Sequence, residues 1–462
     1  MATESQTFEE IKPELEERLA EAARRHRVPG AAVGILRGGE EQYACHGVTS
    51  IENPLAVDEA TLFQIGSTTK TFTATAAMRL AEQGRLSLDA TVRTYVPELR
   101  LEDESVAERV TVRQLFNHTA GWAGDHFVDM GFGDDALTRY VESMAELEQR
   151  SPLGAIASYN NASLCLAGRV IEKVTGTTYE AALTELVLEP LGLAESFFFP
   201  WAVMTRRFAS GHVEQKDEQQ VARPWHLPRT ANPAGGLVCS IRDQIRYASF
   251  HLGDGTADGK RVLSQATLER MKQATFSLEG GSLGDEVGIA WLLRKIEGVQ
   301  LVGHGGSTHG QEAAFQMVPE RDFAIAVLTN SDRGSILHRE LVSWALERYL
   351  SVEDREPTPL ELPAAALAEY AGDYRSEMGT LTLVVEGDRL VATVSYSEEA
   401  LSHMRAVFGD QEPEPKPMPL RILPGDRCLV VDGDAKGRKG NFVREEGRIT
   451  GVNLGGRLAA RV

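Results

Sequence analysis

Two side chains with complementary chemistry stand three positions apart near the start of the chain. Ser67 precedes Lys70, at a point where a strand-like apolar run gives way to a helix-like one. Residues three apart share a face of a helix, so we expect the Ser67 hydroxyl and the Lys70 amine to touch. A hydroxyl becomes a useful nucleophile when a neighbouring base takes its proton. Lys70 can be that base if burial lowers its pKa from about 10.4 toward neutrality, and the apolar run after it predicts such burial.

The value of this spacing depends on partner residues further along the chain. Alone it is a weak signal, because most Ser-x-x-Lys pairs are a helix cap followed by a solvated lysine. Downstream, Tyr159 and Asn161 open an apolar, helix-like run. A Tyr hydroxyl there can relay a proton and an Asn amide can bind a substrate carbonyl. Taken alone, an interfacial aromatic and a helix-capping asparagine are the more economical interpretation.

A third group follows the strand-like segment 299–302. It consists of His304, Gly305, Gly306 and Ser307. Glycines in a strand allow another backbone or a ligand to approach closely. An exposed backbone N–H of Ser307, paired with that of the nucleophile, would form an oxyanion hole. In isolation a glycine-rich bend with an incidental histidine is the simpler interpretation.

Together, and in this order, the three groups resemble the motifs of the serine β-lactamase and penicillin-binding-protein superfamily: Ser67-x-x-Lys70, Tyr159-x-Asn161 and His304-x-Gly306. The Tyr-x-Asn version is similar to the branch that holds class C β-lactamases, D-amino-acid-directed peptidases and family VIII esterases. Supporting phrases with the same resemblance lie at 115–121, 234–237 and 327–330. The resemblance covers residues 8 to 350.

The resemblance implies an acyl-transfer mechanism in two steps. Ser67 attacks a carbonyl and forms an acyl-enzyme, while Lys70 and Tyr159 take its proton and pass it to the leaving group. The backbone N–H groups of Ser67 and Ser307 stabilise the oxyanion, and a water activated by Tyr159 and Lys70 then releases the acid. The substrate-binding residues that the resemblance implies are Asn161, His304, Gly305 and Gly306.

The third motif departs from the pattern of the superfamily's β-lactamases. It begins with His304, where most of them carry a lysine that holds the substrate carboxylate. Histidine is mostly neutral at pH 7, so carboxylate capture should be weaker here. The departure favours an esterase or a D-residue-directed peptidase over a dedicated β-lactamase. The substrate is therefore expected to be a small ester, an amide or a short peptide.

Three alternatives stay open at this point. An acyltransferase would use the same nucleophile but let an alcohol or amine replace water. A binding protein would keep the fold without turnover. An α/β-hydrolase would use Ser282, because 280–284 matches Gly-x-Ser-x-Gly; that motif needs a strand before it and a helix after it. The acidic residues around 280–284 instead predict a flexible loop.

Composition limits the classes of function. The formal net charge of −19 repels phosphate backbones, so nucleic-acid binding is not expected. Residues 1–6 are polar and lack the parts of a signal peptide, and no apolar run approaches membrane-spanning length, so we expect a cytoplasmic protein without membrane contact. The four cysteines form no Cys-x-x-Cys pair, which predicts reduced thiols. No metal and no cofactor is expected.

The chain of 462 residues is long enough for two domains. We predict a catalytic α/β domain at 1–352, in which helices flank an antiparallel sheet and a helical region is inserted. Its strands are expected from both ends of the domain: at 30–37 and 41–47, and again at 287–294, 299–303, 311–318 and 322–329.

The charged, Pro-rich segment 353–366 is expected to be a linker. Alternating apolar residues after it predict an all-β domain at 367–462, a small antiparallel barrel that resembles the lipocalin-like appendage of some relatives. Its role has three candidates: restricting substrate size, mediating self-association into a homo-oligomer, or only stabilising the chain.

Overall fold

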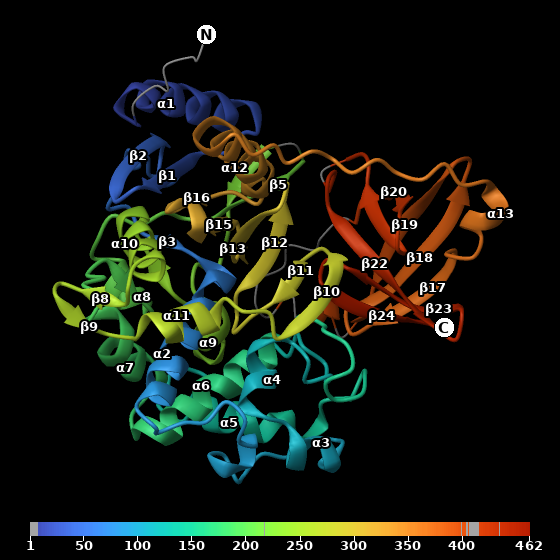
Figure 1. The fold of residues 1–462 in the computed structure, drawn as a ribbon, viewed down its shortest axis with the longest axis horizontal. Coiled ribbons are helices and arrows are strands. Elements are labelled where there is room, and N and C mark those ends of the chain that lie inside the picture. The colour runs from blue at the N-terminus through green and yellow to red at the C-terminus, as the bar shows by residue number, and fades with distance from the viewer. Residues whose placement is uncertain (1–7, 217, 399, 403–404, 406–414, 434) are drawn as a thin grey trace.

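The computed structural model describes residues 8–216, 218–398, 400–402, 405, 415–433 and 435–462. The first six residues, on which the leader-peptide expectation depended, lie outside that range. Within it, the catalytic part is built on one antiparallel sheet in the order β10-β11-β12-β13-β15-β16-β1-β2, and β14 pairs with β15 beside this path (Figure 1). The strands are β1 Gly30–Arg37, β2 Glu40–Gly47, β10 Phe276–Gly281, β11 Gly284–Val287, β12 Leu292–Ile296, β13 Val299–Gly303, β14 Gly306–Thr308, β15 Gln311–Val318 and β16 Phe323–Thr329.

Strands from the two ends of this part of the chain pair with each other next to the β2 edge of the sheet. β1, from the start of the chain, pairs with β16 in a register that places Val33 opposite Val327. Nearly every residue of both strands is buried, because helices cover both faces of the sheet. The predicted construction from two distant sequence segments is confirmed. The predicted strand 287–294 is wrong: it spans the end of β11, a turn at 288–291 and the start of β12.

Two helices far apart in the sequence cover one face of the sheet. They are α1, Phe8–Arg25, and α12, Gly334–Leu350, whose apolar residues share a core cluster with Val33 and Val327. The opposite face packs on α10, Ile241–Leu252. There Gly34 allows a close approach, since a Cβ at this position would lie 2.4 Å from Cγ1 of Ile245.

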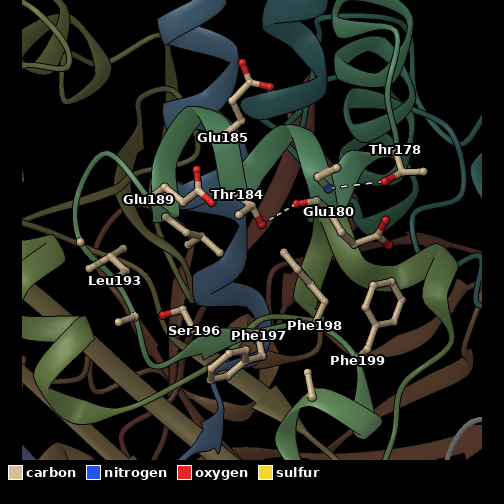
Figure 2. A pocket seen from close by; sticks show the side chains of 15 residues that line it. Thr178, Glu180, Thr184, Glu185, Glu189, Leu193, Ser196, Phe197, Phe198 and Phe199 are labelled. Carbon is tan, nitrogen blue, oxygen red and sulfur yellow. Dashed lines mark hydrogen bonds between the residues drawn. The ribbon is translucent and has the colours of Figure 1, made fainter.

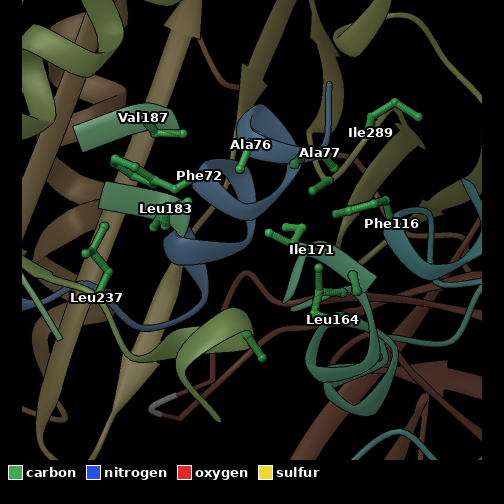
Figure 3. Packing of buried hydrophobic residues seen from close by; sticks show 14 of the residues in the cluster. Phe72, Ala76, Ala77, Phe116, Leu164, Ile171, Leu183, Val187, Leu237 and Ile289 are labelled. Carbon is green, nitrogen blue, oxygen red and sulfur yellow. The ribbon is translucent and has the colours of Figure 1, made fainter. Parts of the chain in front are cut away.

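The inserted region is helical, and a buried helix runs through it. This helix, α2 (Thr69–Glu82), is buried along most of its length, and Figure 3 shows Phe72, Ala76 and Ala77 among side chains from the surrounding helices. The other helices of the region are α3 Glu104–Arg109, α4 Val112–Phe116, α5 Ala136–Ser143, α6 Asn161–Thr175, α7 Tyr179–Leu183, α8 Pro200–Val203, α9 Asn232–Gly235 and α11 Gln265–Met271. Among the residues that the structure describes, no helix is both long and apolar enough to cross a membrane.

The C-terminal part is a closed barrel of eight antiparallel strands in sequence order, which closes by pairing β17 with β24. This is the up-and-down arrangement in which no strand is left at an edge. Buried residues such as Tyr374 and Phe442 form its own core. The predicted fold class is confirmed. The strands are β17 Gly372–Ser376, β18 Gly379–Glu386, β19 Arg389–Tyr396, β20 Met418–Leu423, β21 Arg427–Val430, β22 Lys439–Glu445, β23 Arg448–Leu454 and β24 Arg457–Arg461.

The barrel lies against the β10 edge of the sheet (Figure 1). The turn of the β10–β11 hairpin takes part in this contact, because Oγ of Ser282 accepts a hydrogen bond from the Gly455 N–H at 2.8 Å and donates to the Lys439 carbonyl. The segment 280–284 is therefore a docked hairpin rather than the flexible loop that its sequence predicts. No helix follows it, so the context of an α/β-hydrolase nucleophile is missing.

Candidate active site

Ser67 and Lys70 lie at the start of the buried helix α2. Ser67 is in a short 3₁₀ turn, Gly66–Thr68, and Lys70 is the second residue of α2. Nζ of Lys70 lies 2.9 Å from Oγ of Ser67. The Ser67 side chain is only half-buried, whereas the Lys70 side chain is fully buried. Residue 67 is therefore partly accessible, while the amine of Lys70 is kept from water.

The surroundings of Lys70 suit a neutral amine. Its Nζ donates to Oδ1 of Asn161 at 2.7 Å and to the carbonyl of Ala234 at 2.6 Å. Both partner atoms are acceptors, so each can take one N–H bond of the amine, and the lone pair of the neutral form is then left to face the hydroxyl of Ser67. Burial lowers the pKa of Lys70 to about 7. Lys70 can therefore act as a base near neutral pH.

Tyr159 precedes helix α6, whose N-cap is Asn160. Nζ of Lys70 lies 4.8 Å from the centre of the Tyr159 ring, and the Ser67 side chain is near enough to the phenol to influence its pKa. Burial raises the pKa of Tyr159 above its ordinary value, so the phenol stays protonated. His118 supports this loop, since its Nδ1 accepts from the Asn160 N–H at 3.1 Å and its ring lies 4.5 Å from that of Tyr159.

The third motif touches the nucleophile through its backbone. A Cβ on Gly306 would lie 1.8 Å from the Ile65 carbonyl oxygen and 2.9 Å from the Ser67 nitrogen, and a Cβ on Gly66 would lie 2.6 Å from the Ser307 nitrogen. The two backbone segments are thus in direct contact, and the absence of side chains permits it. Ser307 itself is exposed. Its N–H and that of Ser67 therefore belong to one small patch of backbone beside the hydroxyl.

His304 stands at the back of the same site as a neutral acceptor. Its Nδ1 lies 2.5 Å from the Gly305 carbonyl, which can only accept, so Nδ1 carries the proton. Burial and the charge of Lys70 lower the pKa of His304 to about 3. Its Nε2 is buried and has no hydrogen-bond partner among the described residues. The ring centre lies 6.1 Å from that of Tyr159.

Asn161 is held at both ends of its amide. Oδ1 accepts from Lys70, and Nδ2 donates to Oδ1 of Asp125 at 2.7 Å. Arg457 completes this group with two hydrogen bonds to Asp125, of which the one to Oδ1 is 3.0 Å long. The sequence analysis did not identify Asp125 or Arg457. Asp125 lies in a loop without a motif, and Arg457 lies five residues before Val462, in a domain that sequence patterns treat as separate.

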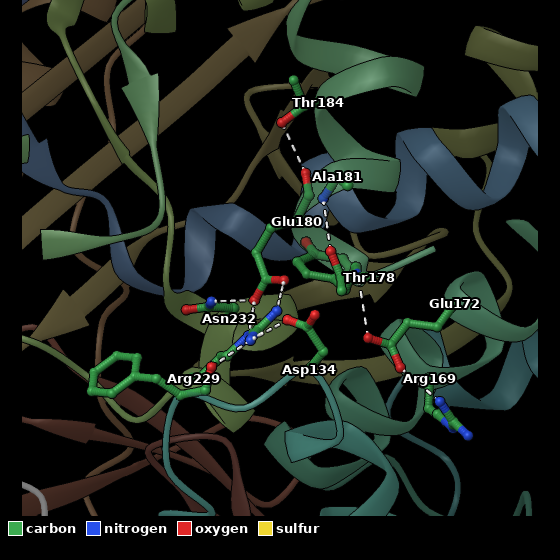
Figure 4. Close-up of polar contacts among 11 residues, drawn as sticks. Asp134, Arg169, Glu172, Thr178, Glu180, Ala181, Thr184, Arg229 and Asn232 are labelled. Atoms are coloured by element: carbon green, nitrogen blue, oxygen red, sulfur yellow. Dashed lines mark hydrogen bonds and ion pairs between the residues drawn. The ribbon is translucent and has the colours of Figure 1, made fainter. Parts of the chain in front are cut away.

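A buried ion pair lies next to the segment that carries the Ala234 carbonyl. Arg229 binds Glu180 through two hydrogen bonds of 3.1 and 3.0 Å, and Nδ2 of Asn232 donates to the same carboxylate at 2.7 Å (Figure 4). Asn232 is the first residue of α9, and Ala234 lies in that helix. The pair therefore fixes α9 and, with it, one of the two acceptors of Lys70.

A large cavity lies away from this chemistry. It has a volume of about 890 Å³, and aromatic side chains including Phe197, Phe198 and Phe199 line it together with Glu185 and Glu189 (Figure 2). None of the predicted site residues lines it. In the part of the chain that the structure describes, no cluster of His, Cys, Asp or Glu is placed to hold a metal ion.

Comparisons with known proteins agree with this geometry. The sequence profile of the Beta-lactamase family matches residues 15–342. Penicillin-binding protein 4 of Amycolatopsis lactamdurans is 34% identical over 361 residues, which are 77% of this chain and 95% of that protein. The crystal structure of SurE superposes over 99% of this chain and 100% of its own, with a TM-score of 0.78 and 26% identity. A class C β-lactamase from Rhodobacter sphaeroides covers 72% of this chain and 99% of its own, with a TM-score of 0.58 and 24% identity.

The two structural matches differ in what they cover. The likeness to SurE extends over the sheet, the helical region and the barrel, whereas the class C enzyme covers a smaller share of this chain. The profile match includes Ser67, Tyr159 and His304, one residue from each motif. The chain therefore belongs to the β-lactamase family of serine hydrolases.

Proposed function

We propose that this protein hydrolyses an ester, an amide or a short peptide through an acyl-enzyme on Ser67. The observation that carries the proposal is the contact between the hydroxyl of the half-buried Ser67 and a buried lysine whose two other contacts are both acceptors. This arrangement brings a nucleophile and a base together at one point. The phenol of Tyr159 adds a proton donor beside the same hydroxyl.

The reaction follows from these contacts. As Oγ of Ser67 bonds to the carbonyl carbon, its proton moves to Nζ of Lys70, and the carbonyl oxygen becomes an anion beside the backbone N–H groups of Ser67 and Ser307. The anion collapses, the bond to the leaving group breaks, and Tyr159 donates its proton to that group while Lys70 returns a proton to Tyr159. Water then attacks the acyl-enzyme by the same route in reverse and frees the acid.

The third motif bears on the substrate class. Because His304 is neutral and its Nε2 is buried, it supplies no cation for a substrate carboxylate. This supports an esterase or a D-residue-directed peptidase rather than a dedicated β-lactamase. SurE has also been solved with D-Leu, in a structure that matches this chain at a TM-score of 0.75 and 26% identity. That structure supports a substrate with a D-residue.

A panel of three substrates tests the proposal. p-Nitrophenyl acetate, a D-alanyl anilide and nitrocefin should be compared with the wild-type chain and with Ser67→Ala. We expect turnover of the ester or the anilide, nitrocefin to be the poorest substrate, and no turnover by Ser67→Ala. Equal activity of Ser67→Ala would refute the nucleophile, and no acylation by any reagent would favour a binding protein. Faster turnover of nitrocefin than of the other two would contradict the argument from His304.

A further inference from the structure

A turn of the barrel is built into the loop that carries Tyr159. The N–H of Tyr159 donates to the Gly456 carbonyl at 2.7 Å, and the N–H of Leu458 donates to Oγ of Ser158 at 3.1 Å. The residues involved connect β23 to β24 and start β24. The barrel backbone is thus fixed to the second motif at the proposed proton donor itself and at the residue before it.

Arg457 lies between these two contacts and points to a buried carboxylate. Its guanidinium binds both oxygens of Asp125, and its Cζ lies 5.3 Å from the centre of the Tyr159 ring. The Asp125 side chain is only 3% exposed, and a cation partner stabilises a carboxylate at such a buried position. Nη1 of Arg457 also approaches the Gly455 carbonyl at 3.4 Å. The fork of the guanidinium is therefore already occupied by protein groups.

The contacts continue from Asp125 to the nucleophile without a gap. Oδ1 of Asp125 accepts from Nδ2 of Asn161 at 2.7 Å, and Oδ1 of Asn161 accepts from Nζ of Lys70 at 2.7 Å. Lys70 in turn lies 2.9 Å from Oγ of Ser67. The Asp125 carboxylate can bind only the NH₂ group of the Asn161 amide. Asp125 therefore fixes the orientation of this amide, so that its oxygen faces Lys70.

Resting on the acyl-enzyme function proposed above, we propose that Arg457 is a positioning residue that the barrel supplies to the catalytic site. By pairing with Asp125 it orients the Asn161 amide and balances the buried negative charge, so that Lys70 is kept as the neutral amine. Without Arg457, the charge of Asp125 would stand unbalanced and would favour the ammonium form of Lys70. The barrel then has a role in the chemistry as well as in stability.

Other charged and titratable groups around Lys70 also raise or lower its pKa. After burial, which has the largest effect, Cys165 and Asp125 raise the pKa of Lys70 and Arg457 lowers it. The carboxylate of Glu377, in the barrel turn between β17 and β18, accepts from the Asp125 N–H at 3.1 Å, and burial raises its pKa. The remaining titratable groups near Lys70 are His118 and His304, whose pKa values are lowered by burial, and Tyr159, whose pKa is raised by burial.

The pH dependence of labelling by a fluorophosphonate tests the proposal without knowledge of the substrate. The second-order rate of labelling should be measured against pH for the full-length wild type and for Arg457→Gln. We expect the midpoint of the acid limb to move up by on the order of one pH unit in Arg457→Gln, because a neutral side chain no longer opposes protonation of Lys70. In the double variant Asp125→Asn/Arg457→Gln, the midpoint should return toward the wild-type value.

Two further variants separate charge from folding. Arg457→Lys keeps the charge and should keep the wild-type midpoint, although its labelling rate should fall because an ammonium cannot bind both carboxylate oxygens. Arg461→Gln is the matched control, since Arg461 lies on the same strand, also near a tyrosine ring, but donates to the carbonyls of Glu369 and Ala371, just before β17. It should leave the midpoint unchanged.

The outcomes distinguish this inference from the proposed function. A midpoint in Arg457→Gln equal to that of the wild type would overturn the inference, as would an equal shift in Arg461→Gln or in Arg457→Lys. If Arg457→Gln changed only the KM for carboxylate-bearing substrates, the residue would be a binding group instead of a positioning one. Failure of the wild type to label at Ser67 would overturn the proposed function itself.

Discussion

At the scale of single residues, the account depends on how the protein treats one lysine. A solvated lysine is protonated at neutral pH and cannot take a proton from serine. Here burial lowers the pKa of Lys70 to about 7 and so favours its neutral amine, which two acceptors hold in place. Burial raises the pKa of the Tyr159 phenol, so the phenol stays protonated and can act as an acid. The base and the acid are thereby assigned to different residues by their surroundings.

The pH profile is expected to show this assignment. The pKa of Lys70 is lowered to about 7, so the ammonium dominates below that pH and the amine above it. The value of kcat/KM should therefore rise with pH and reach half of its plateau near pH 7. Lys70→Arg stays charged at every accessible pH, so its profile should lack this limb and its rate should be lower by a factor of about 100 or more. A wild-type profile that is flat through neutrality would contradict the role of Lys70.

His304 offers a test of specificity at the same scale. His304→Lys restores a cation where the superfamily's β-lactamases carry one, so it should improve binding of a substrate carboxylate. We expect the ratio of kcat/KM for nitrocefin to that for p-nitrophenyl acetate to rise by about tenfold, since effects on Lys70 cancel in the ratio. His304→Gln, which stays neutral, should leave the ratio unchanged. An unchanged ratio in the lysine variant would mean that residue 304 does not face the carboxylate.

At the scale of elements, two backbone segments must touch to form the oxyanion site. The contact requires glycine at 306, because an added Cβ would lie 1.8 Å from the Ile65 carbonyl oxygen. The glycine could be identified from the sequence as part of the third motif. Gly306→Ala should displace β14 and lower kcat by about 100-fold or more, the effect of losing one oxyanion donor. Gly305→Ala is the matched control, since the nearest contact of the added Cβ would be 3.5 Å away. Its kcat should fall far less than that of Gly306→Ala. Equal losses in the two variants would refute the steric argument.

The helix α9 depends on the buried pair of Arg229 and Glu180. Glu180→Ala would leave the guanidinium with the exposed Asp134 as its remaining ion-pair partner, and we expect the free energy of unfolding to fall by about 3 kcal/mol. Urea denaturation measures this change. Glu185→Ala, at an exposed position on the same cavity, should change the free energy of unfolding by about 0.5 kcal/mol or less. A similar stability of both variants would mean that the pair does not support this region.

At the scale of the whole molecule, sequence patterns predicted the layers well. The paired strands β1 and β16 are long and apolar, and apolar residues alternate with polar ones along the barrel strands. Both types of strand could therefore be predicted from the sequence. The motifs also predicted that Ser67, Lys70 and Tyr159 would lie together. The contribution of Arg457 was not predictable, because it depends on how two domains pack, and side chains at such a contact have no periodic pattern. The turn at 288–291 was missed because it lies within an otherwise apolar run.

The same packing decides between the two serines that sequence motifs suggested. The Ser282 hydroxyl is held by Gly455 and Lys439, so it fixes the barrel and is not available as a nucleophile. Ser282→Ala should lower the melting temperature by a few degrees, as expected for the loss of one or two hydrogen bonds, and should retain turnover. Loss of all turnover in a folded Ser282→Ala protein would favour the α/β-hydrolase alternative.

The central claim is that the Ser67 hydroxyl is the group that becomes acylated. Its most direct test is intact-protein mass spectrometry after treatment with a fluorophosphonate, followed by peptide mapping of the adduct. We predict one adduct per chain, on Ser67, in the wild type and in Ser282→Ala, and none in Ser67→Ala. An adduct that persists in Ser67→Ala, or that maps to another residue of the wild type, would contradict the account.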